Sequence, residues 1–336
     1  MDIELDIMDI SNYITLNLDL LNILLKSINE SKGPMYFGNA GSWDYAVEDL
    51  YCLYNETKKD YESIPYFILG FSLGSFLVRT LLIKHPEVGD GAILMGTGQT
   101  SWLNIKLGLM MANSEVKKHG DSAFTDKIDD LTFGTYNKKF KPNRTTHDWL
   151  CKSEGAIDLY LADPLRGENM TCGLFRELLN SMIYTCTVDN VNKMNKSRPI
   201  YCLSGSDDYV GDKGKGIKKS VDLFKSCGIS DVDMKIYPTL RHDILHENEN
   251  EQIYNDIYGW MVSKKLVNPM AVVSKDEEVK EEKKEIEVVS GDGSNLDISP
   301  VYEHIDAAKP KNKDKKPQNI IIPGQKKEDT KEDSNY

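Results

Sequence analysis

The segment ILGFSLGS at residues 68–75 places a serine, Ser72, between Gly70 and Gly74 in the pattern Gly-x-Ser-x-Gly. This pattern suits a nucleophilic serine when a strand runs into a sharp turn and then into a helix. In such a turn the hydroxyl is exposed, and the two glycines let the strand and helix backbones approach each other. The N–H of Leu73, at the helix start, would point at an oxyanion forming on the substrate. Ser72 is therefore a candidate nucleophile, and the alternative is a serine in a structural turn.

The sequence around Ser72 contains the strand and the helix that this turn requires. YFILGF at 66–71 is a continuous apolar run of strand length. The following LGSFLVRTLLIKHPE has apolar residues at three- and four-residue spacing and stops at Pro86, which predicts a helix. This context favours a catalytic role for Ser72 over a structural one.

A catalytic serine requires a base and a carboxylate, and two later segments offer them. The base takes the serine proton, and the carboxylate fixes the tautomer of the base. Asp207 and Asp208 follow a predicted strand at 199–205, and His242 follows a predicted strand at 232–238. The order Ser, Asp, His along the chain is one that catalytic triads use.

These residues also have simpler interpretations. Asp207 and Asp208 could cap the turn after the strand, as aspartates in such places commonly do. His242 and His246 in HDILH would share one face of a helix and could bind a metal. A zinc protease would need Glu where this chain has Asp243, and a third ligand, so we expect no metal here.

Strand and helix signals alternate along the body of the chain. This alternation predicts an α/β fold with a mostly parallel sheet and helices on both faces. Residues 99–197 have helical character and no clear strand, which we interpret as a helical cap over the site. Ser42 is a plausible N-cap for the first helix. The predicted strands lie at 66–71, 91–96, 199–205 and 232–238, and further helices at 41–61, 214–227 and 249–266.

Three motifs together resemble the lysophospholipase and monoacylglycerol lipase branch of the α/β-hydrolases, also called serine aminopeptidase-like. GFSLGSFLVR is similar to its elbow GHSMGS, SGSDDYVGDKGKGIKK to its acid loop SGxxDPVGxxGKGV, and YPTLRHDILHE to its histidine loop YxGxRHEILNE. FGTYNKKFKPNRTTHDWL also resembles the cap of bacterial members. The likeness covers about residues 41–265. By position it assigns the acid to Asp208 rather than Asp207, and the base to His242.

The resemblance implies a serine hydrolase with the α/β-hydrolase fold. Its expected substrates are carboxylic esters, of the lysophospholipid or monoacylglycerol type, cleaved through an acyl-enzyme without cofactor or metal. Ser72 would be the nucleophile, with Asp208 and His242 completing the triad and Leu73 N–H serving the oxyanion hole. Apolar cap residues would either line an acyl channel or pack in a helical core: Leu107, Leu109, Met110 and Met111.

The first forty residues depart from the family pattern. The chain has no His before His85, so the family's HGxxEHSxRY and DxRGHGxS motifs are missing. The first of these normally contributes an oxyanion donor, and losing one donor typically costs about 10²- to 10³-fold in kcat. Family members carry several strands before the elbow, and the loss of these strands would also expose a sheet edge, which residues 1–40 or a homodimer could cover. The alternative function is therefore a weakened or inactive hydrolase that acts as an interaction module.

Composition restricts the partners and the compartment. The net charge of −12 argues against nucleic acid as a partner. The six cysteines contain no CxxC pair, which indicates reduced thiols in a cytoplasmic protein. The chain has no basic signal-peptide start and no run of 18 apolar residues for an integral membrane segment.

The sequence divides into four parts. The expected division is an atypical N-terminal segment at 1–40, a hydrolase core at 41–98 and 198–266, a helical cap at 99–197, and a charged tail at 269–336. The tail lacks Trp and Phe and is rich in charge, so we expect it to be disordered.

Overall fold

The computed structural model describes residues 35–60, 65–131, 136–163 and 169–264. The charged tail at 269–336 and most of the atypical N-terminal segment at 1–40 lie outside these residues.

The described residues contain one parallel sheet in the order β1-β2-β3-β4. Its register places Gly70 beside Leu94, Leu94 beside Cys202, and Cys202 beside Met234. All residues of β2 and β3 are buried, as expected for central strands covered on both faces. The four predicted strands are confirmed as β1 (Phe67–Phe71), β2 (Gly91–Met95), β3 (Ile200–Gly205) and β4 (Val232–Tyr237).

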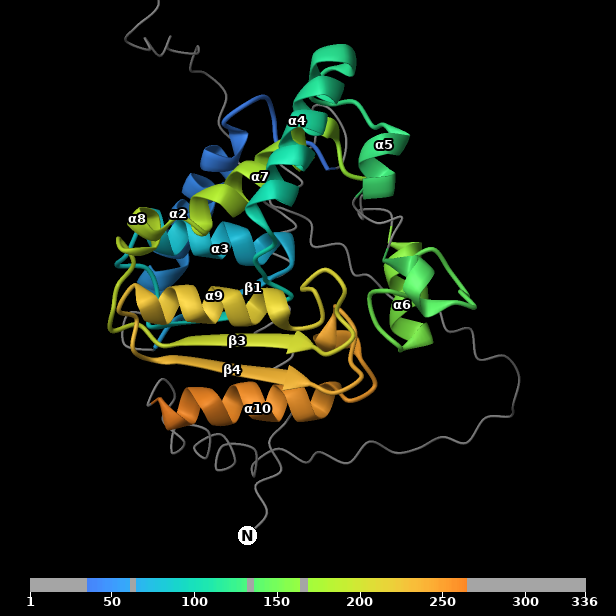
Figure 1. Cartoon of the computed structure of the whole chain (residues 1–336). Coiled ribbons are helices and arrows are strands. Elements are labelled where there is room, and N and C mark those ends of the chain that lie inside the picture. Colours follow the sequence, from blue (N-terminus) through green and yellow to red (C-terminus); the bar gives the residue numbers. More distant parts are fainter. Residues whose placement is uncertain (1–34, 61–64, 132–135, 164–168, 265–336) are drawn as a thin grey trace, which may run out of the picture. The chain divides into compact units, whose positions relative to one another are not determined.

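Helices cover both faces of this sheet (Figure 1). On one face, α3 (Leu73–Lys84) and α9 (Lys215–Ser226) bury apolar residues against alternate positions of β2 and β3. On the other face, α10 (Asn250–Ser263) packs against the intervening positions, where Ile257 and Trp260 join Leu203. The predicted α/β class is confirmed, and the alternation of side chains along each strand explains the two separate cores.

The turn between β1 and α3 has a strained backbone. Ser72 has φ of 50° and ψ of −119°, conformations that L-residues rarely adopt. Its N–H donates to the carbonyl of Met95 on β2 at 2.9 Å, and its carbonyl accepts the hydroxyl of Ser75 at 2.6 Å. A Cβ at Gly70 would lie 2.7 Å from the carbonyl oxygen of Gly74, so strand and helix meet here in backbone contact.

Among its described residues, the connection between β2 and β3 contains several helices and no strand, as the sequence predicts. We call it the insertion. The helices of the insertion are α4 (Trp102–His119), α5 (Asp126–Asp129), α6 (Glu154–Ala162), α7 (Cys172–Thr185) and α8 (Val188–Val191), with a 3₁₀ helix, η2, at Asn137–Phe140. The two long helices of the insertion are α4 and α7, which pack against each other. Leu179 and Phe175 of α7 join Leu77 and Phe76 of α3 in one core.

A buried arginine joins the insertion to the sheet layer. The guanidinium of Arg79, on α3, donates to Thr97 Oγ1 (3.3 Å) and to the carbonyls of Gly98 (3.2 Å) and Thr185 (3.0 Å). It also contacts the ring of Phe76, with 5.3 Å between the guanidinium carbon and the ring centroid. Arg79 is fully buried, so these oxygens replace the water that a cation would otherwise bind.

Two local predictions differ from the structure. Ser42 is the first residue of α2 (Ser42–Asp60) rather than its N-cap, and its buried hydroxyl finds no acceptor or donor among the described residues. Leu107 and Met110 are 53% and 69% exposed, so these two do not belong to a helical core, whereas Leu109 packs against the core of α3 and α7. The exposed pair lies on the outer face of α4, which periodicity alone did not identify.

The contact at Gly70 predicts a cost for any side chain there. We expect Gly70→Ala to lower the free energy of unfolding by about 1–3 kcal/mol, because the neighbouring backbone atoms must move. Urea denaturation followed by circular dichroism measures this change.

Gly259, in α10, is the matched control. A Cβ at this position meets nothing within 4 Å. Gly259→Ala should therefore raise the free energy of unfolding by about 0.5–1 kcal/mol through helix propensity. Equal effects of the two substitutions would contradict the close approach at Gly70.

Candidate active site

Three side chains from three different strand ends meet at the carboxyl edge of the sheet. The Nε2 of His242 lies 2.9 Å from Ser72 Oγ, and its Nδ1 lies 2.9 Å from Asp208 Oδ1. The imidazole is 1% exposed and the carboxylate is fully buried. The structure thus brings together the serine, the histidine and one of the two aspartates that the sequence singled out.

The loop after β3 builds a polar cradle around Asp208. Its Oδ1 accepts the N–H groups of Val210 (2.9 Å) and Gly211 (3.2 Å) in addition to the His242 ring. Burial by itself raises the pKa of this carboxyl, but the charge and hydrogen bond of His242 and the two N–H groups outweigh it. The pKa of Asp208 is therefore held below its ordinary value, and the group is a carboxylate at neutral pH.

The tautomer of His242 follows from this carboxylate. An ionised Asp208 can only accept, so the proton of the neutral imidazole sits on Nδ1. The Nε2 is then free to accept the hydroxyl proton of Ser72. The arrangement is that of a general base next to a nucleophile.

Asp207 is directed elsewhere. Its carboxylate lies 3.5 Å from the ammonium of Lys213 and is partly exposed. Its N–H donates to the carbonyl of Leu240 at 2.9 Å, which joins the acid loop to the histidine loop. The backbone of the turn after β3 thus directs Asp208 toward His242 and Asp207 toward Lys213.

The imidazole of His242 is enclosed by residues that the sequence did not single out. The rings of Phe71 and Trp149 lie 4.9 and 5.3 Å from it, measured between centroids. Gly96 closes a further side, since a Cβ there would lie 2.7 Å from the His242 ring. Gly96 also has φ of 56°, so both space and backbone conformation favour glycine. Trp149 comes from the insertion, within the segment that resembles the family's cap, but that resemblance gave it no role beside His242.

His242 and His246 do not form a metal pair. His246 ends a 3₁₀ helix, η3 (Ile244–His246), and its Nδ1 lies 2.9 Å from the carboxylate of Asp243. That carboxylate raises the pKa of His246. Within the described ranges, no group of three or more His, Cys, Asp or Glu side chains has the arrangement of a metal site.

Leu73 follows Ser72 at the start of α3, and a separate loop leads into α2. Leu73 is the first residue of α3, so its N–H has no acceptor within the helix and lies at the positive end of the helix dipole. Met35 and Gly41 bracket the loop that precedes α2. Thr171 donates to the carbonyl of Met35 at 2.7 Å, and Glu177 accepts the N–H of Gly41 at 3.1 Å. Helix α7 and its N-cap Thr171 therefore anchor this loop.

Solved structures define the class of fold. A highly thermostable carboxyl esterase from Bacillus coagulans, in complex with glycerol, gives a TM-score of 0.64 at 21% identity, covering 71% of this chain and 76% of that one. A lipase in its open form gives a TM-score of 0.62 at 18% identity, covering 71% and 77%. At these identities the likeness concerns the fold alone, and it is the α/β-hydrolase fold.

The sequence profile of the serine aminopeptidase S33 family matches residues 31–249. The chain belongs to this family. The match begins before Met35, so it includes the loop that leads into α2. The resemblance found in the three motifs is thereby confirmed at the level of the family.

Curated relatives are named for lipid esters. The chain is 26% identical over 226 residues to the monoglyceride lipase of Rattus norvegicus, and the match covers 64% of each protein. It is 21% identical over 221 residues to the monoacylglycerol lipase of Mycolicibacterium smegmatis, covering 65% of this chain and 69% of the relative. The matched part thus spans about two thirds of the length of these relatives. Within the described part of the chain, no helix has the length and apolarity needed to cross a membrane.

The depressed pKa of Asp208 predicts how stability depends on pH. Its contribution to stability is fully present above the pKa of an unfolded aspartate, about 3.9, and is lost as the pH falls through the lower folded-state value. We expect the difference in free energy of unfolding between wild type and Asp208→Asn to shrink below about pH 4. Urea denaturation from pH 6 to pH 2 measures it.

Asp207→Asn is the control for this measurement. Its carboxylate is partly exposed and does not contact His242. The difference between wild type and this variant should vary much less over the same pH range. If the free energies of unfolding of wild type and Asp208→Asn differed by a constant amount down to pH 2, the depressed pKa of Asp208 would be contradicted.

Proposed function

We propose that the protein is a serine hydrolase that cleaves carboxylic esters through an acyl-enzyme. The observation that carries this proposal is the chain of two 2.9 Å contacts from Ser72 through His242 to the buried Asp208. A buried carboxylate, a correctly protonated imidazole and a serine on a strained turn are the parts that acyl transfer requires.

The first half of the reaction forms the acyl-enzyme. His242 Nε2 accepts the proton of Ser72 as Oγ forms a bond to the ester carbonyl carbon. The carbonyl oxygen becomes an oxyanion, which the N–H of Leu73 stabilises. The intermediate then collapses, the C–O bond to the alcohol breaks, and His242 gives its proton to that alcohol.

The second half releases the acid. Water takes the place of the alcohol, and His242 Nε2 accepts its proton while the water oxygen attacks the acyl carbon. The second tetrahedral intermediate breaks its bond to Ser72 Oγ, which regains a proton from His242. Throughout both halves Asp208 stays ionised and stabilises the imidazolium, which its depressed pKa supports.

Lipid esters are the proposed substrates. The names of the rat and mycobacterial relatives, a monoglyceride lipase and a monoacylglycerol lipase, support a monoacylglycerol, and the motif resemblance extends this to lysophospholipids. The insertion is proposed as the cap of the site, since Trp149 reaches the catalytic imidazole from it. The triad acts without cofactor or metal.

Labelling with a fluorescent fluorophosphonate tests the proposal. This reagent phosphonylates activated serines, so wild type should be labelled and Ser72→Ala should not. Hydrolysis of a monoacylglycerol by the variant should fall by at least roughly 10⁴-fold, because no other group replaces the nucleophile.

Ser226→Ala is the control. Ser226 ends α9 on the exposed surface, and its hydroxyl donates to the carbonyl of Leu223. This variant should be labelled at the wild-type rate. A folded wild-type protein without labelling would sink the enzyme proposal and favour the alternative of an interaction module.

A further inference from the structure

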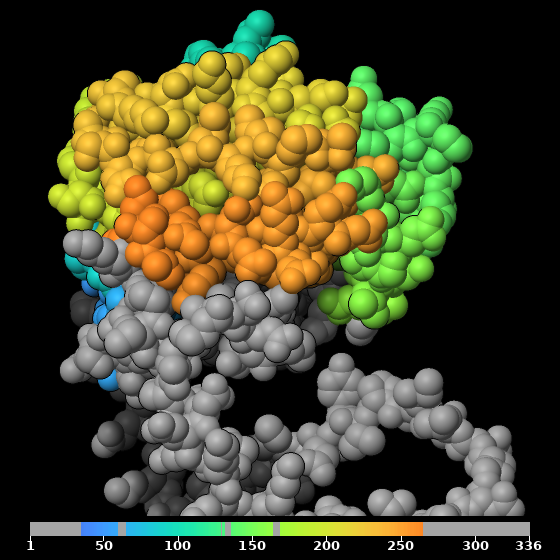
Figure 2. Space-filling model, turned by 90° about the horizontal axis from the view of Figure 1, so that it is seen from below, coloured from blue at the N-terminus to red at the C-terminus, as the bar shows by residue number. Residues whose placement is uncertain are grey.

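Residues 148–152 of the insertion are bonded to the loop that carries His242. The guanidinium of Arg241, the residue before His242, donates to two carbonyl oxygens of this segment, those of Asp148 and Cys151, the latter at 3.0 Å. Figure 2 shows the surface of this part of the insertion (green) directly beside that of the histidine loop and α10 (orange). The insertion therefore contacts the base-bearing loop itself.

A buried carboxylate joins the same two backbones a second time. Glu247 Oε1 accepts the N–H of Arg241 at 2.7 Å, and its Oε2 accepts the N–H of Lys152 at 2.7 Å. The residue is 1% exposed. Burial raises the pKa of Glu247, against the opposing effect of these two N–H groups. A buried N–H needs a hydrogen-bond acceptor. The one carboxylate of Glu247 provides it for the N–H groups of two segments that lie about ninety residues apart in the chain.

The contacts surround His242 on both sides along the chain. After His242, the N–H of Asp243 donates to the carbonyl of Leu150 at 2.7 Å. The centre of the bonded segment is Trp149, whose ring lies 5.3 Å from the imidazole. Any shift of the segment would therefore move a wall of the His242 site.

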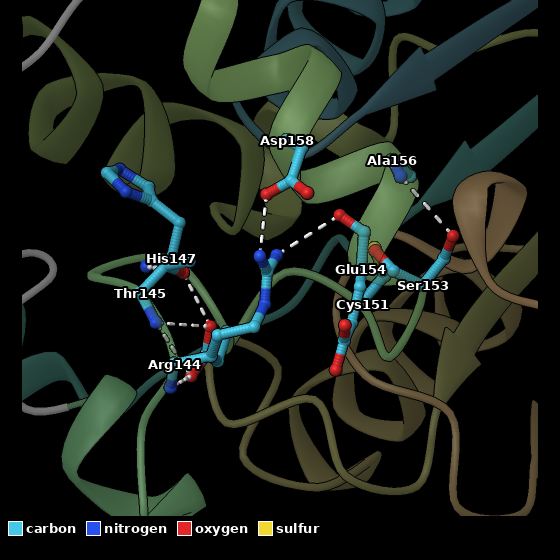
Figure 3. Close-up of polar contacts among 9 residues, drawn as sticks. Arg144, Thr145, His147, Cys151, Ser153, Glu154, Ala156 and Asp158 are labelled. Carbon is cyan, nitrogen blue, oxygen red and sulfur yellow. Dashed lines mark hydrogen bonds and ion pairs between the residues drawn. The ribbon is translucent and has the colours of Figure 1, made fainter.

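The segment is braced from within the insertion (Figure 3). The guanidinium of Arg144 donates to the carboxylate of Asp158 at 2.7 Å and to the carbonyl of Glu154 at 3.1 Å. The N–H groups of Arg144 and Thr145 both donate to the carboxylate of Asp148, at 2.6 and 3.0 Å. These bonds tie the turn before Trp149 to α6, so the segment that meets the histidine loop is also bonded within the insertion.

We propose that Arg241 and Glu247 are positioning residues for the catalytic base. They lock residues 148–152 onto the histidine loop, so that the ring of Trp149 keeps the imidazole of His242 in line with Ser72. The insertion then serves the chemical step as well as covering the site. This inference rests on the proposed function, because it takes His242 to be the base.

Two substitutions that remove opposite charges, one negative and one positive, test the inference. Glu247→Gln keeps the shape but replaces one acceptor oxygen with a donor, and Arg241→Met keeps an apolar stem without the guanidinium. Both should lower the fluorophosphonate labelling rate and the kcat for a small acetate ester by roughly 10- to 100-fold, because catalysis is sensitive to misplacement of about 1 Å. An effect of charge alone on the imidazolium would change the two rates in opposite directions.

A spectroscopic readout separates positioning from a general loss of stability. The proton that His242 Nδ1 donates to Asp208 gives a far-downfield proton NMR signal in a fixed, buried pair. In both variants we expect this signal to broaden or shift at a temperature where circular dichroism shows a folded protein. If Glu247→Gln does not fold, Arg241→Met decides the question by the same readouts.

Glu249→Gln is the matched control. It removes the same charge two residues further on, where the partly exposed carboxylate of Glu249 accepts the ammonium of Lys152 at 2.9 Å. This variant should keep the wild-type labelling rate and NMR signal. Wild-type behaviour of Glu247→Gln or Arg241→Met would overturn the inference, whereas an unlabelled wild type would instead overturn the proposed function.

Discussion

The site depends on a turn between β1 and α3 that an L-amino acid adopts only under strain. The positive φ of Ser72 is maintained by the bond from its N–H to β2 and by the hydroxyl that its carbonyl accepts from Ser75. Gly70 makes the turn possible, since strand and helix touch through their backbones. With the turn held in this way, the hydroxyl of Ser72 lies within hydrogen-bond distance of His242, and helix α3 starts at the next residue, Leu73.

The parallel sheet brings this turn together with Asp208 and His242. Its register aligns the carboxyl ends of neighbouring strands, so the loops after β1, β3 and β4 come to the same edge. The loops then pack at backbone distance. A side chain at Gly205 would overlap the carbonyl of Leu240, and one at Gly96 would overlap the imidazole of His242. Close packing holds the imidazole of His242 at one position, from which it reaches both Ser72 and Asp208.

The insertion combines two kinds of contact with this core. Through α7 the insertion shares an apolar core with α3. The buried Arg79 joins the C-terminal end of α7 to the loop after β2, because its guanidinium donates to the carbonyls of both Thr185 and Gly98. Through residues 148–152 the insertion bonds directly to the histidine loop. The first contact is mainly apolar packing, whereas the second consists of directional hydrogen bonds. Directional bonds suit the place where the orientation of one ring decides whether proton transfer is possible.

The sequence by itself determined the four strands, their alternation with helices, the elbow serine and the two candidate loops, because periodicity and Gly-x-Ser-x-Gly spacing are local properties. The family resemblance assigned the acid to Asp208 by position, and the tertiary structure gives the physical reason, since the turn after β3 directs that carboxylate to His242. Only the tertiary structure showed that Trp149 and Gly96 enclose the imidazole. It also placed Leu107 and Met110 on an exposed face. These outcomes depend on contacts between segments far apart in the chain, and a local pattern carries no information about which distant backbone a side chain will meet.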